Sequence, residues 1–125
     1  MIENYGNVQA VLRELRQALQ ALKDTGATYS VYVEKTGLTD EEQVEVLETL
    51  GKGPITIDLS ETEQPVKWYE TQFSGIWVGT FKNHRDENIL HTIEVCKYPT
   101  IAGAFEEDME TAIEELDTWI DAANM

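Results

Sequence analysis

The spacing of hydrophobic and polar positions predicts two helices in the first half of the chain. Apolar residues recur every third or fourth position over residues 8–22, which is the pattern of an amphipathic helix. Asn7 is expected to cap its start, and Gly26 follows its end as a left-handed terminator. A shorter helix is expected over residues 40–50. Thr39 is its cap, and three carboxylates in its first turn favour the helix dipole.

Alternating polar and apolar residues, many of them β-branched or aromatic, predict a strand over residues 28–35. Further strands are expected over residues 55–59, 66–73, 76–82 and 89–96. Ser74-Gly75 is expected to join the third and fourth of these as a tight hairpin, and residues 83–88 form a polar loop before the fifth.

A last helix is expected after Pro99, with Thr100 as its cap. One face is apolar and the other is acidic, and no basic residue follows Lys97. The apolar face is formed by Ile101, Phe105, Met109, Ala112, Ile113, Leu116, Trp119 and Ile120. The acidic face is either simply solvated or guides a basic partner segment.

The order of these elements predicts the fold class. Early helices followed by a run of strands favour an α+β two-layer sandwich, with a mostly antiparallel sheet of about five strands and the helices packed on one face. We detect no repeat, low-complexity tract or linker, so residues 1–125 are expected to form a single domain.

A formal net charge of −15 changes the list of expected partners. Nucleic acid and anionic membranes are recruited by basic residues, so we expect neither as a partner. A basic protein or peptide suits the charge, although solubility alone also explains it. A single cysteine excludes an internal disulfide framework and suits a reducing compartment. No run approaches the ~18 apolar residues of a spanning helix, so we expect a cytoplasmic protein.

The candidate reactive groups are few. Cys96 lies beside Lys97, which could lower a thiol pKa, but His91 falls on the opposite face of the same predicted strand. His84 and His91 lack the close spacing of zinc ligands. We therefore expect no catalytic residues, no metal and no cofactor, and a packed Cys96.

The hairpin and the strand after it hold the residues that we expect to contact a protein partner. These are Glu70, Phe73, Trp77, Glu94 and Tyr98. Exposed aromatic patches favour protein contacts, but half of the hairpin aromatics must pack in the core, and the pattern leaves open which half. Glu70 and Glu94 flank the same strand. They are too far apart to share a proton, and outward-facing carboxylates or hydrogen bonds to loop backbone also explain them.

The sequence from Glu70 to Trp77 reads ETQFSGIW, and TIEV at residues 92–95 is followed by Pro99. This pattern resembles the C-terminal conserved domain of the HupH/HyaF hydrogenase expression proteins. The first half, with LRELRQALQALKDTG at residues 12–26, is also similar. The resemblance implies an α/β two-layer sandwich without catalytic activity.

The resemblance further implies a chaperone-like accessory protein of [NiFe] hydrogenase maturation that binds the hydrogenase small subunit or its signal segment. Twin-arginine signals are basic near their start, so an acidic binder would suit them. An alternative is a small-molecule or metal-binding domain with a site near Cys96, formed with His91 or Glu94. A further hypothesis is a homodimer that pairs the edge strand over residues 28–35 across a two-fold axis.

Overall fold

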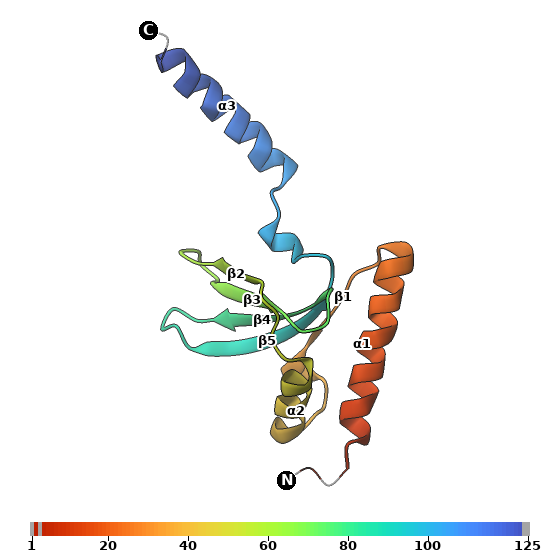
Figure 1. The fold of residues 1–125 in the computed structure, drawn as a ribbon. Coiled ribbons are helices and arrows are strands. Elements are labelled where there is room, and N and C mark those ends of the chain that lie inside the picture. The colour runs from red at the N-terminus through yellow and green to blue at the C-terminus, as the bar shows by residue number, and fades with distance from the viewer. Residues whose placement is uncertain (1, 3, 124–125) are drawn as a thin grey trace.

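The computed structural model describes residue 2 and residues 4–123 and shows an α+β fold (Figure 1). In chain order its elements are α1 (Gly6–Thr25), β1 (Tyr29–Tyr32), the 3₁₀-helix η1 (Val33–Lys35), α2 (Asp40–Leu50), β2 (Thr56–Leu59), β3 (Val66–Glu70), β4 (Ile76–Lys82), β5 (Asn88–Val95), the 3₁₀-helix η2 (Thr100–Ala102) and α3 (Glu106–Ala123). The strands form one antiparallel sheet in the order β1-β5-β4-β3-β2. The predicted fold class is confirmed.

Helices α1 and α2 cover one face of the sheet. Their apolar residues, and those of the strands beneath them, form the main core: Val8, Leu15, Leu22, Val33, Val46, Leu50, Ile76, Val78, Ile93 and Val95. The two helices are also joined by a hydrogen bond, because Asn7 Nδ2 donates to Glu42 Oε2 at 3.3 Å. Apolar packing and the Asn7–Glu42 hydrogen bond therefore both hold the helix layer together.

The helix ends follow the sequence signals at Gly26 and Thr39, but not at Asn7 or at Thr100, which is the first residue of η2 and makes no capping bond. Gly26 ends α1 in the left-handed region at φ 80°, as predicted. Thr39 and Glu42 form a complete capping box at the start of α2. Asn7 does not cap α1, because the helix begins one residue earlier and Asn7 is used for the bond to α2.

The opposite face of the sheet has a smaller core of its own. Val66, Trp68, Trp77 and Cys96 are buried there, bordered by Ile57, Leu59 and Phe81. Trp68 lies against Gly79 of β4, and its Nε1 donates to Glu94 Oε2 at 2.7 Å. Trp77 Nε1 donates to the Cys96 carbonyl oxygen at 3.1 Å. Both indole N–H groups are thus satisfied within the protein.

Two predicted strands are shorter than expected. The alternation over residues 28–35 continues into η1, where Thr36 Oγ1 donates to the Val33 carbonyl and closes a helical turn. The strand expected over residues 66–73 ends at Glu70, because Thr71 Oγ1 accepts from the Phe73 N–H and bends the chain into the hairpin turn. Alternation does not report these side-chain bonds to the backbone.

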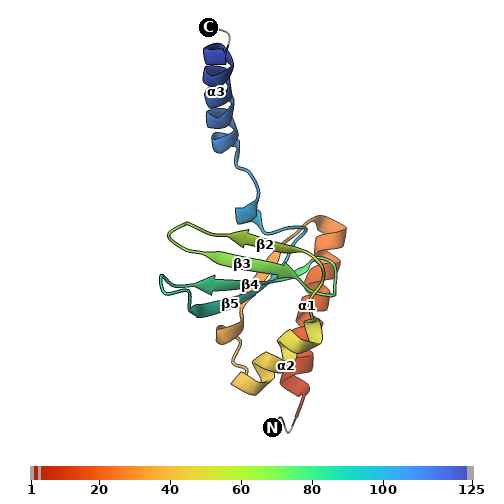
Figure 2. The ribbon, with the colours of Figure 1, turned by 60° about the vertical axis from the view of Figure 1, so that its left-hand side comes forward.

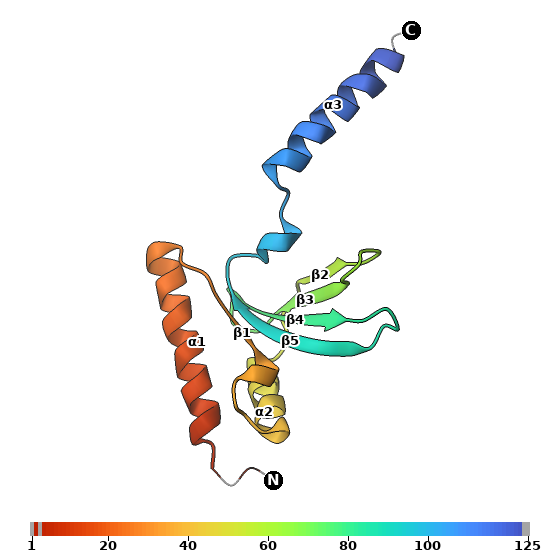
Figure 3. The same cartoon turned by 180° about the vertical axis from the view of Figure 1, so that it is seen from behind.

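The last helix differs most from expectation. Gly103 is extended and separates η2 from α3, so the predicted single helix after Pro99 is divided and Ile101 lies outside α3. Figures 1, 2 and 3 show α3 projecting away from the sheet, with no other element beside it. None of its residues is buried. Within the described part of the chain, no helix has both the length and the hydropathy to cross a membrane.

Candidate functional site

A series of neighbouring pockets runs along α1 and past the β3–β4 turn. The first, of about 260 Å³, is lined mainly by apolar residues that include Leu12, Leu19 and Phe73. The next pockets share Leu19 with it and add Lys23, Ser74 and Lys97. We call this surface the α1 groove and define it by Leu12, Arg16, Leu19, Lys23, Phe73, Ser74 and Lys97.

The hairpin turn shapes one wall of the groove. Gly75 has φ 91°, a conformation that L side chains rarely adopt, and a Cβ there would lie 2.9 Å from Leu19 Cδ1. Its N–H donates to Glu70 Oε2 at 3.1 Å, so this carboxylate holds the turn in place. The absence of a side chain at Gly75 therefore lets the turn approach α1 closely.

Three of the charged side chains along the α1 groove are basic, although the chain as a whole is acidic, and the carboxylate among them, Glu70, accepts a hydrogen bond from the Gly75 N–H. Arg16, Lys23 and Lys97 are exposed and line its pockets. None of the three forms an ion pair with any residue that the structure describes. The groove therefore combines an apolar floor with unpaired cations at its rim.

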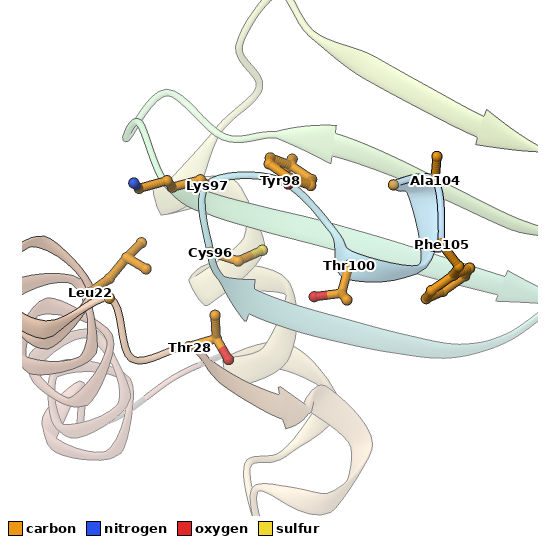
Figure 4. Close-up of a pocket in the computed structure, with 10 residues that line it drawn as sticks. Leu22, Thr28, Cys96, Lys97, Tyr98, Thr100, Ala104 and Phe105 are labelled. Carbon is orange, nitrogen blue, oxygen red and sulfur yellow. The ribbon is translucent and has the colours of Figure 1, made fainter. Parts of the chain in front are cut away.

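At its end the groove continues into a pocket of about 340 Å³ between α1 and the segment that leads to α3 (Figure 4). Cys96 lines this pocket with Tyr98 and Phe105. Burial, and then the nearby Glu94 carboxylate, raise the pKa of the Cys96 thiol to about 11. A thiol in that state is mostly protonated near neutral pH, so it is a poor nucleophile and a poor metal ligand.

The other groups of the small-molecule or metal hypothesis do not converge on this pocket. The His91 ring lies 3.4 Å from Glu34, beside η1, on the face of the sheet opposite to Cys96. Glu94 accepts hydrogen bonds from Trp68 and from Thr92. Among the described residues, no group of three or more His, Cys, Asp or Glu side chains could hold a metal ion.

The five residues predicted to contact a partner are divided by the structure. Phe73 and Tyr98 are exposed, with 45% and 60% of their surface accessible, and Phe73 lines the groove while Tyr98 lines the pocket at its end. Glu70 also lines the groove and supports its turn. Trp77 is only 3% exposed, so its ring belongs to the packed half of the hairpin aromatics, which the sequence had left open, and it is not accessible to a partner.

The carboxylates Glu70 and Glu94 flank Trp77 in the sheet, because Glu70 pairs with Trp77 on one side and Glu94 on the other. Both are engaged within the protein: Glu70 by the Gly75 N–H, as the loop-backbone alternative foresaw, and Glu94 by the Trp68 and Thr92 side chains. Because both carboxylates already accept hydrogen bonds within the protein, the exposed aromatic residues Phe73 and Tyr98 are the better candidates for contact with a partner.

Sequence reasoning did not find the α1 side of the groove. Leu12 and Leu19 belong to a helical stripe that is wider than the buried part of α1, which is the signal that could have identified them. Arg16 and Lys23 border that stripe about two turns apart on α1. Basic residues clustered beside apolar ones in so acidic a chain were the second signal.

The family model described as "HupH hydrogenase expression protein, C-terminal conserved region" matches residues 6–123. The chain belongs to this family. The resemblance seen in the hairpin sequence is thus confirmed over nearly the whole chain. The description of the family names a conserved region and no activity.

Curated relatives are similar over most of this chain. The hydrogenase expression/formation protein HupH of Rhizobium leguminosarum bv. viciae is 28% identical over 114 residues, which are 90% of this chain and 40% of that protein. The hydrogenase expression/formation protein HupQ of Azotobacter chroococcum mcd 1 is 33% identical over 112 residues, which are 88% and 39%. The chain therefore spans about two fifths of the length of these relatives.

A solved structure shares the fold. The hydrogenase expression protein HupH from Thiobacillus denitrificans superposes with a TM-score of 0.83 at 24% identity, and the match covers 96% of this chain and 98% of that one. Because α3 comprises 18 of the 125 residues, a match of this extent includes the projecting helix.

Proposed function

We propose that this chain is a non-catalytic accessory protein of hydrogenase maturation that binds a hydrogenase small subunit or its signal segment. The observation that carries the proposal is family membership over residues 6–123, together with relatives named as hydrogenase expression/formation proteins. The groove supports a binding role, because it offers the exposed Phe73 ring beside the partly buried side chains of Leu12 and Leu19. A cytoplasmic location is part of the proposal, since maturation precedes export.

The chemistry of the described residues favours binding over catalysis. The thiol of Cys96 is protonated and 5% exposed, and the histidines are not placed beside it. The pocket at Cys96 keeps a small-molecule role as the competing hypothesis, because its volume suits a small ligand. Among the described residues, neither His91 nor a cluster of metal-ligating side chains accompanies Cys96 there.

Binding to an immobilised hydrogenase small subunit tests the proposal. The subunit is prepared with and without its signal segment, and binding is measured at low and high salt. Capture of the wild-type chain is expected. If the acidic surface attracts a basic segment, capture weakens when salt is raised or the segment is removed. No capture of either form would overturn the proposal. Salt-independent capture would overturn only its electrostatic part.

Matched variants locate the contact. Replacing Phe73 or Tyr98 by Ala is expected to weaken capture about tenfold or more, because truncating a contact aromatic costs on the order of 2 kcal/mol. Tyr32→Ala is the control, since this aromatic on edge strand β1 has the same exposed fraction as Phe73, 45%. Equal losses in all three variants would contradict the assignment of the contact to the groove.

A further inference from the structure

Helix α3 presents an apolar surface that nothing in the chain covers. Met109, Ile113, Leu116 and Ile120 recur at helical spacing along one side, with Trp119, 75% exposed, at its edge. We call these five residues the α3 stripe. A helix of 18 residues is marginal in water by itself, and helices in proteins owe most of their stability to packing of such a face. The stripe is therefore expected to be covered in solution.

The borders of the α3 stripe define the chemistry of what covers it. Helical periodicity places Glu106, Glu110 and Asp117 along one border, and Asp108 and Glu115 along the other. The helix carries eight carboxylates and no base. Pairing of two α3 helices would bring these like charges together, so the surface that fits is apolar with cations along its rim.

The α1 groove has this chemistry. Its leucines and Phe73 are apolar, and Arg16, Lys23 and Lys97 are cations without ion pairs among the described residues. The dimensions also agree: Leu12 to Lys23 on α1 and Met109 to Ile120 on α3 each span about 17 Å at 1.5 Å per residue. The α3 stripe with its acidic borders and the α1 groove with its basic rim are thus complementary in polarity, charge and length.

The chain's own α3 does not fill its own groove, because the helix stands clear of the rest of the chain in every view (Figures 1, 2 and 3). The solved relative of the same fold matches over an extent that includes this helix. We propose that α3 docks in the α1 groove of a second copy, which returns its own α3 in exchange. The result is a closed dimer with two identical contacts. This proposal stands independently of the proposed function.

The test compares two variants with defects on opposite sides of the contact. The stripe variant is Ile113→Asp with Leu116→Asp. The groove variant is Arg16→Glu with Phe73→Asp. Wild type is expected at twice its 14.2 kDa by light scattering after gel filtration, and each variant at 14.2 kDa. All four substituted residues are exposed, and circular dichroism checks that both variants fold.

Mixing the variants provides the decisive measurement. A mixture regains a dimer, because the intact α3 of the groove variant fits the intact groove of the stripe variant. The matched control, Thr111→Asp with Thr118→Asp, adds the same charge to the opposite side of α3 and stays dimeric. A monomeric wild type overturns the proposal. A groove variant that remains a dimer also overturns it and would indicate α3–α3 pairing. A stripe variant that remains a dimer overturns it as well and would indicate pairing of edge strand β1. Capture of a hydrogenase subunit is measured separately, so the failure of one proposal is not the failure of the other.

Discussion

Replacing Gly79 by Ala tests how the second face of the sheet is held together. Gly79 lies in the middle of β4, paired with Trp68 on β3 and Thr92 on β5. A Cβ at this position would lie 2.6 Å from Thr92 Oγ1 and 2.9 Å from the Trp68 atoms Cδ1 and Nε1. The indole is buried and donates to Glu94, so it cannot move aside without losing that bond.

The expected cost follows from these contacts. Inserting a methyl group into a packed site costs about 1–3 kcal/mol. If the indole shifts, the buried Nε1–H loses its acceptor, which costs about 1–3 kcal/mol more. Alanine returns about 0.5–1 kcal/mol, because glycine loses more backbone freedom on folding. We expect a net loss of about 1–5 kcal/mol, which is a sizeable part of the ~5–15 kcal/mol by which a domain of this size is stable.

Urea unfolding followed by circular dichroism measures this loss as a lower midpoint at an unchanged slope. Thr92→Ala serves as the partner in a double-mutant cycle, because it removes the oxygen that lies closest to the new Cβ. The two changes together are expected to cost at least 0.5 kcal/mol less than the sum of their separate effects, the usual lower limit of coupling between touching residues. A Gly79→Ala protein as stable as wild type, or strictly additive effects, would refute this account of the sheet.

The remaining predictions test other parts of the argument. Trp77→Ala is expected to cost about 3–5 kcal/mol in the same unfolding assay, since its ring is buried; a stable variant with weaker capture would return Trp77 to the contact surface. Cys96 should react slowly with a thiol reagent at pH 8 in the native state and rapidly in urea, because burial raises its pKa to about 11 from 9.0. Hydrogen bonding to Thr39 lowers the pKa of Glu42 below its ordinary 4.5. The stability that the carboxylate supplies is therefore present above pH 4.5 and lost as pH falls through the folded pKa. Glu42→Gln should thus lower the free energy of unfolding near neutral pH, and the difference from wild type should become smaller in acid. If both proposals hold, the stripe variant should capture a hydrogenase subunit more tightly than wild type, because its groove is empty.

The local signals in the sequence were sufficient for most of the fold. The cap at Thr39, the left-handed terminator at Gly26 and the central strands each depend on neighbours in the chain, and each prediction is confirmed. The face that Trp77 occupies also follows from alternation. Whether that face is buried does not, because burial depends on Trp68 and Cys96, which reach it from other strands. The contact residue was therefore misjudged although its strand was correct.

The placement of α3 could not be predicted for a related reason. An amphipathic pattern states that an apolar face will be covered, but it does not state which molecule supplies the cover. The same limit applies to the site: Phe73 was found from the hairpin, whereas Leu19 and Arg16 come from a helix more than 50 residues earlier. Only the fold shows that these residues share a groove.

The distribution of charge links the two proposals. Eight carboxylates lie on α3, so this helix alone supplies more than half of the net charge of −15, while the groove is one of the few places where exposed cations gather. In the exchanged dimer the carboxylates that border the α3 stripe would neutralise the cations at the rim of the groove, and the carboxylates on the far side of each α3 would face solvent. A basic signal segment would then meet the exposed carboxylates of α3 beside a groove that already holds the apolar face of that helix. Electrostatic attraction acts over about 8 Å at physiological salt, whereas apolar interactions require van der Waals contact. Charge would therefore bring such a segment to the groove, and apolar contacts would decide whether the segment displaces α3.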